Sequence, residues 1–171
     1  MRARCNGVVI AALLTLLLAL DANPRPAATG AASHAAPKAV TACMAVTRAD
    51  VELALGRKVA RGEEENGNGS STCDYTSGGG QVTVTIQRLA APPDLAQEKA
   101  SLTAEFPNSS VRQARVEGAD AFFLDLGDSG TLLHVIRGGR DYVLIAVLGF
   151  GAPSDVSPAA AQLARTALSR Q

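Results

Sequence analysis

The chain has 171 residues, of which 47% are apolar, and its formal net charge at pH 7 is +0. This length and composition indicate one globular domain preceded by a further segment. A balanced charge excludes the strongly basic surface that attracts nucleic acid, and no basic patch alternates with aromatic residues.

The N-terminal segment has the pattern of a secretory signal peptide, which we predict to span residues 1–35. Arg2 and Arg4 form a basic start, and Val8–Leu20 is a mostly apolar run of thirteen residues. A membrane-spanning helix needs about twenty apolar residues, so this run fits the apolar core of a signal peptide better. An uncleaved N-terminal anchor is the alternative.

Cleavage sites with small residues follow the apolar run, at Ser33-His34-Ala35 and, closer to the run, at Ala22. We predict that residues 36–42 form a linker and that residues 43–171 form a single domain. Removing residues 1–36 takes three arginines and one aspartate from the sixteen basic and sixteen acidic residues, which leaves 13 and 15. The exported chain should therefore be close to neutral, so it has no positive electrostatic field that would attract nucleic acid.

The cysteines predict one disulfide. Cys5 precedes the apolar run and should leave with the signal peptide, so Cys43 and Cys73 are the pair that remains. In an oxidising compartment such a pair is typically bridged. Closing this loop should stabilise the domain by about 3–4 kcal/mol on the chain-entropy model.

The first helix should begin at Thr47 and end at Gly56. The hydroxyl of Thr47 can accept a hydrogen bond from the amide of Asp50, whose carboxylate can reach back, which makes a variant of the capping box. Gly56 is a natural C-terminal stop. The apolar positions that should pack inward are Val46, Val51, Ala54 and Leu55.

Strands follow this helix. Arg57–Gly62 is predicted to be a short strand, Glu63–Ser71 a solvated loop and Thr72–Thr76 a returning strand. In Gln81–Gln87 valine and isoleucine alternate strictly with threonine and glutamine, which predicts a strand with one packed and one wetter face.

The second half begins with a helix capped by Asp94 and Gln97 and ended by Pro107, with a thin apolar stripe. Four strands should follow, at Val111–Val116, Ala121–Leu126, Thr131–Ile136 and Tyr142–Leu148. The last of these is apolar on both faces, so we expect a central strand that is covered on both sides. A final helix should start at Ser157 with Pro158 in its first turn.

This order of elements is helix, strands, helix, strands, helix. It predicts an α+β domain in which helices pack against an antiparallel sheet. Each half is a helix followed by a meander, which hints at a weak internal duplication.

The string Gly127-Asp128-Ser129-Gly130 matches the nucleophile loop of trypsin-like serine proteases. That chemistry needs a histidine within hydrogen-bond reach of the serine, held in turn by an aspartate. The candidate base is His134, five residues downstream on the adjoining strand. A polar turn between two strands accounts for the same residues, and we favour that interpretation.

Three further patterns are weaker. Glu64-x-Asn66-x-Asn68 spaces oxygen ligands as calcium loops do, but the closing position falls on Tyr75. Gly149-Phe150-Gly151 resembles half of a dinucleotide fingerprint and lacks the βαβ continuation. His134 has no partner histidine or cysteine with which to bind zinc. We therefore predict no catalytic residues, no cofactor and no metal ligands.

The pattern Cys43-x-x-x-Thr47-x-x-Asp50, with the later Cys73-Asp74-Tyr75, resembles small exported bacterial proteins that include actinobacterial lipoproteins. In these a cysteine precedes a short Thr-capped helix and a second cysteine sits before an aromatic residue. The resemblance covers about residues 43–150 and implies an extracytoplasmic α+β domain with a Cys43–Cys73 bridge. The sequence departs from the lipoproteins because it lacks the lipid-carrying cysteine directly after the apolar run, since Cys5 precedes that run.

These observations favour a secreted or periplasmic, non-enzymatic domain that binds a protein or a cell-envelope component through its sheet face or loops. It should keep no membrane span after signal cleavage. One alternative is a small exported hydrolase that uses Ser129 and His134. Another is an inhibitor of an exported enzyme.

Overall fold

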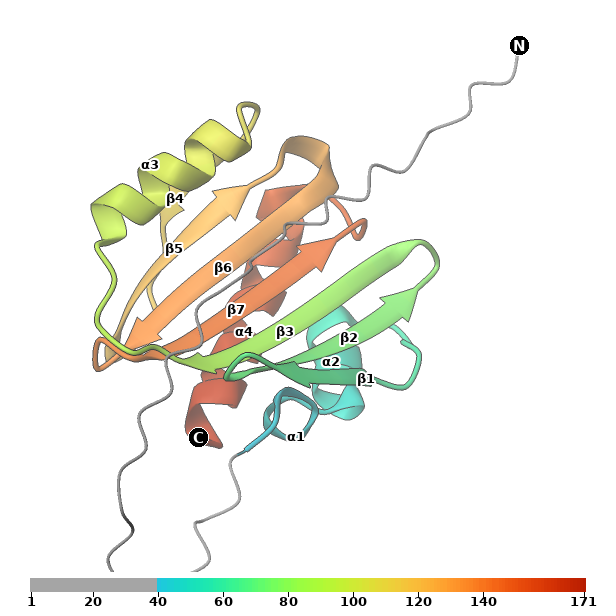
Figure 1. Cartoon of the computed structure of the whole chain (residues 1–171). Coiled ribbons are helices and arrows are strands. Elements are labelled where there is room, and N and C mark those ends of the chain that lie inside the picture. The colour runs from blue at the N-terminus through green and yellow to red at the C-terminus, as the bar shows by residue number, and fades with distance from the viewer. Residues whose placement is uncertain (1–39) are drawn as a thin grey trace, which may run out of the picture. The chain divides into compact units, whose positions relative to one another are not determined.

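The structure, a computed structural model, describes residues 40–171. The predicted signal peptide, residues 1–35, and most of the predicted linker lie outside the described residues. Residues 40–171 form a seven-stranded antiparallel sheet with strand order β1-β2-β3-β7-β6-β5-β4, and helices pack against it (Figure 1). The predicted α+β class is confirmed.

The strands are β1 (Glu63–Gly67), β2 (Ser70–Ser77), β3 (Gly80–Arg88), β4 (Ser110–Gln113), β5 (Ala119–Asp125), β6 (Gly130–Arg137) and β7 (Asp141–Leu148). The helices are α1 (Ala42–Ala45), α2 (Arg48–Leu55), α3 (Leu95–Glu105) and α4 (Pro153–Ser169), and a 3₁₀ turn, η1 (Gly127–Ser129), precedes β6. Two meanders, β1 to β3 and β4 to β7, join where β3 pairs with β7.

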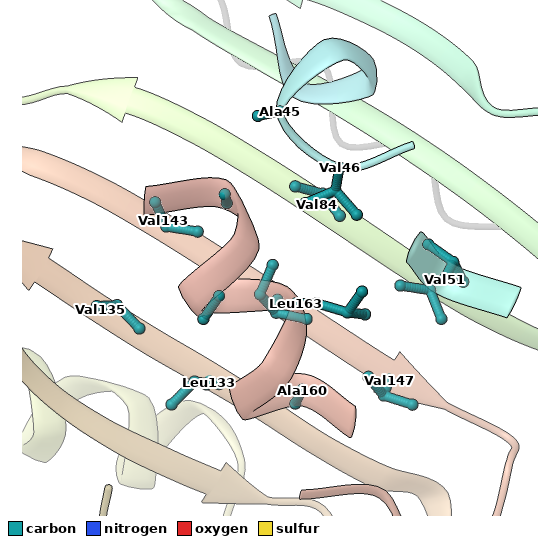
Figure 2. Close-up of a cluster of buried hydrophobic side chains, with 14 of the residues drawn as sticks. Ala45, Val46, Val51, Val84, Leu133, Val135, Val143, Val147, Ala160 and Leu163 are labelled. Atoms are coloured by element: carbon teal, nitrogen blue, oxygen red, sulfur yellow. The ribbon is translucent and has the colours of Figure 1, made fainter. Parts of the chain in front are cut away.

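One face of the sheet carries the core, which α4, α1 and α2 cover (Figure 2). Alternation along each strand sends every second apolar side chain to this face. Leu163 of α4 lies at the centre of the cluster and is completely buried. The core side chains labelled in Figure 2 are Ala45, Val46, Val51, Val84, Leu133, Val135, Val143, Val147, Ala160 and Leu163.

The opposite face of the sheet is covered only in part, by α3. This helix lies over β5 and β6, where the Lys99 ammonium sits 5.0 Å from the centroid of the Phe122 ring. No residue of α3 is completely buried, and its predicted apolar stripe (Leu95, Leu102, Phe106) is half-buried. The face that β2, β3 and β7 present on this side is left accessible, and we call it the open face.

The predicted caps of α2 are confirmed. The amide of Thr47 donates to the Asp50 carboxylate at 2.8 Å, and the amide of Asp50 donates to the Thr47 hydroxyl at 3.4 Å. Gly56 ends the helix with φ +65°, a left-handed conformation that glycine adopts without strain.

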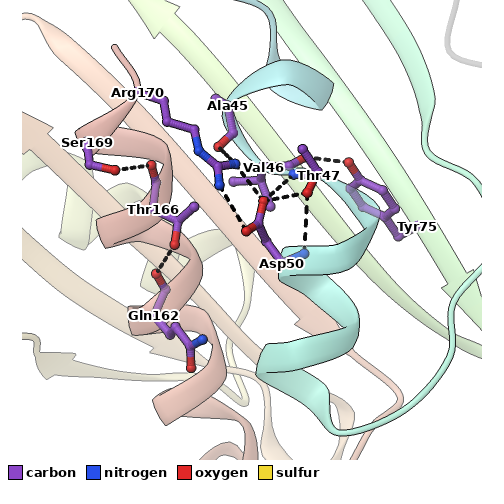
Figure 3. Close-up of polar contacts among 9 residues, drawn as sticks. All are labelled: Ala45, Val46, Thr47, Asp50, Tyr75, Gln162, Thr166, Ser169 and Arg170. Carbon is purple, nitrogen blue, oxygen red and sulfur yellow. Dashed lines mark hydrogen bonds and ion pairs between the residues drawn. The ribbon is translucent and has the colours of Figure 1, made fainter.

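The N-terminal helices are tied to the rest of the domain at two points. The sulfurs of Cys43 and Cys73 lie at disulfide bonding distance, with their Cα atoms 5.1 Å apart, so the predicted pairing is present. Arg170, just after α4, donates a hydrogen bond to the carbonyl of Ala45 at 3.0 Å. Its guanidinium group also donates to both carboxylate oxygens of Asp50, at 2.6 and 3.0 Å (Figure 3). These contacts join α1 to β2, and α2 to the end of α4.

The first strand differs from the prediction. Arg57–Gly62 is not a strand, and Glu63–Gly67, predicted to be loop, is the edge strand β1. The reason is the turn at Asn68-Gly69, where both residues have positive φ (51° and 77°), as a two-residue hairpin turn requires. This turn folds the glutamate-rich stretch onto β2, and charged side chains suit an edge strand because they oppose further strand pairing.

The final helix also starts earlier than predicted. It begins at Pro153, so Ser157 is not its cap and Pro158 lies inside it. A proline suits the first helical position because that amide has no intrahelical partner. The earlier start adds the buried Val156 to the inner stripe formed by Ala160, Leu163, Ala164 and Ala167, and this burial outweighs the hydrogen bond that Pro158 cannot make.

The strand β7 is central, as predicted, but only its core face is completely covered, and on the other face Ala146 is buried while Leu144 is not. Val147 is completely buried beneath α4, whereas Leu144 on the other face is only half-buried because α3 lies over β5 and β6 instead. The expectation that Leu144 is buried is therefore wrong. The helices that precede the two meanders, α2 and α3, lie on opposite faces, so their placement adds no support for an internal duplication.

Candidate functional site

A cluster of polar side chains lies between α3 and the sheet. The hydroxyl of Tyr142 on β7 is 2.8 Å from Nδ1 of His134 on β6, and a Glu98 carboxylate oxygen on α3 is 3.5 Å from the same nitrogen. Two neighbouring strands and a helix that precedes them by about thirty residues thus meet at one imidazole. We call Glu98, His134 and Tyr142 the polar cluster.

His134 is only 4% exposed. Alternation in β6 sends Leu133 and Val135 to the core, so His134 projects to the face below α3. Its ring stacks on that of Phe122, its partner on β5, with centroids 4.7 Å apart and planes 6° from parallel. Burial lowers the pKa of His134 to about 4, so the imidazole is neutral at pH 7. Its Nε2 has no hydrogen-bond partner among the described protein atoms.

Glu98 is the acidic member of the cluster, and its side chain is 27% exposed. Burial raises the pKa of its carboxyl group. Within residues 40–171 no lysine or arginine nitrogen lies within 4 Å of this carboxylate, and the neighbouring Lys99 is directed onto the Phe122 ring. Burial, and then the nearby Glu98 charge, raise the pKa of Tyr142, which stays protonated.

An open groove with a volume of about 530 Å³ lies beside the polar cluster, and we call it the α3 groove. Its walls are the start of α3, the loop before it, and the ends of β3 and β7. The lining residues are Gln87, Leu89, Pro93, Asp94, Gln97, Glu98, Ser101 and Tyr142. Two members of the polar cluster, Glu98 and Tyr142, thus reach the surface in this groove.

The start of α3 is held in place by its cap. One carboxylate oxygen of Asp94 accepts hydrogen bonds from the amides of Ala96 and Gln97, at 2.9 and 3.1 Å. The predicted capping role of Asp94 is confirmed, and it fixes the wall of the α3 groove to the first turn of the helix.

The open face continues from the groove onto β3 and β2 with short polar side chains. The hydroxyls of Thr72 and Thr85 lie 3.1 Å apart across the strands. Asp74 accepts from Gln81 at 2.9 Å and also from Thr83. Such cross-strand pairs hold the side chains in place, so this surface is polar and ordered.

The structure does not bring Ser129 and His134 together. Ser129 lies exposed in η1, where its amide donates to the carbonyl of Leu126 at 3.1 Å, as in the predicted turn. Five residues of extended strand separate two side chains by about 15 Å, far beyond hydrogen-bond reach. The Nδ1 of His134 is engaged by Tyr142, not by an aspartate.

The calcium-like and dinucleotide-like sequence patterns have structural roles. Both Glu64 carboxylate oxygens accept from protein donors, Asn66 at 2.9 Å and Thr41 at 3.0 Å. In the part of the chain that the structure describes, no group of three His, Cys, Asp or Glu residues could hold a metal ion. Gly149 and Gly151, both with positive φ, lead the chain from β7 into α4.

Neither Glu98 nor Tyr142 belongs to a motif that the sequence patterns single out. A signal for Glu98 is present, since it lies three residues after Leu95 and four before Leu102, on the apolar stripe of α3. A carboxylate on the face of a helix that packs against a sheet indicates that a polar side chain of the sheet lies next to it. No comparable local signal identifies Tyr142, because its contacts come from β6 and α3.

Comparison of the chain with protein-family models, with curated proteins and with solved structures finds no match. None of the helices in residues 40–171 has the length and apolar character needed to cross a membrane. The class of protein is therefore defined by its own features: an α+β domain with a cysteine pair at bonding distance and a polar groove beside a lightly packed helix.

Proposed function

We propose that this protein is a secreted or periplasmic, non-enzymatic domain that binds a protein or cell-envelope component in the α3 groove. The observation that carries the proposal is the incomplete cover of one sheet face. The helix α3 leaves a groove in which hydrogen-bonding side chains of β3, β7 and α3 converge. Clefts with a few convergent polar groups are the usual form of binding sites.

The proposed extracytoplasmic location rests on three supports. The first 35 residues have the pattern of a signal peptide, and the pairing of Cys43 with Cys73 is of a kind that persists in oxidising compartments. The resemblance to exported bacterial proteins points the same way.

Binding is favoured over hydrolysis because the described residues supply no activated nucleophile near the groove. Ser129 lies in η1, just before β6, about 15 Å from His134. The alternative of a hydrolase built on these two residues gains no support from the geometry.

Site-specific photo-crosslinking tests the proposal. A photoreactive residue replaces Gln97, which is exposed and lines the groove, and in a matched variant replaces Thr103, which is exposed on the same helix outside the lining. After export and irradiation, the Gln97 variant should form a discrete adduct that the Thr103 variant lacks. Equal adducts from both positions, or none from either, would contradict the proposed site.

A further inference from the structure

We propose that Asn68 is a site of spontaneous deamidation and isomerisation, and that the isoaspartate formed there releases the edge strand β1 from β2. The segment Asn66-Gly67-Asn68-Gly69 contains two Asn-Gly pairs in succession, and all four residues are exposed. An asparagine is modified when the backbone nitrogen of the next residue attacks its side chain. Glycine favours this attack because it has no side chain in the way. The hairpin leaves only the second pair free to react.

The reaction needs only water. The amide nitrogen of Gly69 loses its proton and attacks the side-chain carbonyl carbon of Asn68. The new carbon–nitrogen bond closes a five-membered imide, and the side-chain nitrogen leaves as ammonia. Water then adds to one imide carbonyl, and the carbon–nitrogen bond at that carbonyl breaks. Opening at the side-chain carbonyl gives aspartate. Opening at the main-chain carbonyl gives isoaspartate, in which the chain runs through the former side chain and is one carbon longer.

The reacting groups of Asn68 and Gly69 are not held by the fold. Among residues 40–171 no hydrogen-bond partner contacts the Asn68 side chain or the Gly69 amide. A side chain added at Gly69 would meet no atom within 4 Å, so the tip of the hairpin projects into open space. The two residues can therefore rotate into the geometry of attack without a clash against the rest of the domain.

The first pair is protected by the strand. Gly67 pairs with Ser70 across the two-residue turn, and there the two residues exchange both backbone hydrogen bonds. The amide nitrogen of Gly67 is therefore engaged. The Asn66 side chain in turn donates to the Glu64 carboxylate at 2.9 Å. Both hydrogen bonds must break before Asn66 can react.

Asn108 provides an internal reference, because it is the third asparagine in residues 40–171 and is also exposed. The next residue is Ser109, whose side chain hinders the attack. The amide of Ser109 also donates to the carbonyl of Phe106 at 2.9 Å. Asn108 should therefore be the slower site in the same sample.

The two products should have different effects on the hairpin. Asn68 and Gly69 have positive φ, 51° and 77°, and a two-residue turn of this type has no room for an additional backbone carbon. All five residues of β1 are exposed, so little buried apolar surface holds the strand once the turn is lost. Aspartate leaves the backbone unchanged and, like asparagine, tolerates positive φ. Isoaspartate alone should therefore release β1.

Ageing of the protein at mildly alkaline pH, followed by peptide mass mapping, tests the site. Tandem fragmentation locates the gain of one mass unit at each asparagine. In the folded protein Asn68 should react at least about tenfold faster than Asn66, because Asn66 must first lose two hydrogen bonds. In urea both Asn-Gly pairs should react at similar rates. Similar rates in the folded protein, or reaction at Asn68 only in urea, would overturn the proposal.

Two variants test the position. Asn68→Gly keeps the turn, since glycine adopts positive φ without strain, and should abolish the rapid modification. Asn66→Ser removes the protected asparagine and should leave the rate at Asn68 unchanged. Rapid modification that persists in Asn68→Gly, or is lost in Asn66→Ser, would contradict the assignment.

Hydrogen exchange tests the release of β1. The isoaspartate form is separated from aged protein by chromatography and compared with freshly prepared Asn68→Asp, which has the same charge on an unmodified backbone. The amide of Gly67 should exchange faster in the isoaspartate form, because its hydrogen bond to β2 is lost. Equal exchange in the two forms would show that β1 stays paired and would overturn that part of the proposal.

Discussion

The unequal cover of the two sheet faces predicts unequal costs for one substitution made on each face. Leu133 on β6 projects into the core and is completely buried, whereas Leu144 on β7 projects to the open face and is only half-buried. The two are close neighbours in the sheet, because Leu133 pairs with Ile145 and Leu144 pairs with His134. We therefore compare Leu133→Ala with Leu144→Ala.

The expected magnitudes follow from burial. Leucine to alanine removes three carbons, and at about 0.8 kcal/mol for each buried methylene the lost transfer free energy is about 2.4 kcal/mol at Leu133. A residual cavity of about 50 Å³ beneath α4 adds about 1 kcal/mol. The total is about 3–4 kcal/mol. At Leu144, which is half-buried, at least about two-thirds of this transfer free energy is lost and no closed cavity forms, so we expect about 1.5–2 kcal/mol.

Urea unfolding of the disulfide-intact protein measures both values. Each variant should shift the midpoint without changing the dependence of the unfolding free energy on urea. Equal costs at Leu133 and Leu144 would mean that a further layer covers the open face, which would refute both the partial cover by α3 and the binding site derived from it. A cost below about 0.5 kcal/mol at Leu133, typical of a surface position, would refute the core assignment.

Three further predictions concern single groups. The hydrogen bond from Arg170 lowers the pKa of Asp50 to about 2, so the stability from this pair is complete above about pH 4 and is lost as the pH falls towards 2. In urea unfolding between pH 2 and 5, Asp50→Asn should reduce this loss of stability. An unchanged dependence of the unfolding free energy on pH would contradict the pairing. Because burial lowers the pKa of His134 to about 4, the unfolded chain takes up a proton near pH 6.5 that the folded chain does not bind. Stability should therefore fall as the pH drops from 6.5 to 4. His134→Gln should remove this dependence, and a variant that keeps the full dependence would contradict the burial of a neutral imidazole. Replacing Cys43 and Cys73 together by serine should lower the unfolding free energy by about 2–5 kcal/mol with an unchanged circular dichroism spectrum. Thiol titration of the unreduced exported protein should find no free thiol. Two free thiols would exclude the bridge.

The local features of this fold could be predicted from the sequence because they depend on residues a few positions apart. The capping box of Thr47 and Asp50, the stop at Gly56 and the cap at Asp94 each involve backbone groups within one helical turn. The alternation in β3 identified the face that packs into the core. The pairing of Cys43 with Cys73 followed from cysteine count and predicted compartment.

The prediction of a loop at Glu63–Gly67 was wrong because backbone hydrogen bonds, and not the side-chain pattern, make this segment a strand. Glu63–Gly67 has the composition of a loop, and it becomes β1 because the Asn68-Gly69 turn places its backbone against β2. Residue composition indicates whether a side chain is exposed to water. Both faces of this edge strand are exposed, as a loop is, so an edge strand and a loop have similar compositions.

The candidate site was decided by the tertiary structure alone. An apolar strand such as β7 does not reveal which of its faces a helix covers, and only the placement of α3 over β5 and β6 leaves Leu144 accessible and opens the groove. His134 was noticed in the sequence as a histidine without partners of its own kind. Glu98 and Tyr142 reach it from elements that lie 36 residues before and eight residues after it in the chain. Local pattern cannot encode such contacts, because they exist only once the sheet register and the helix position are set together.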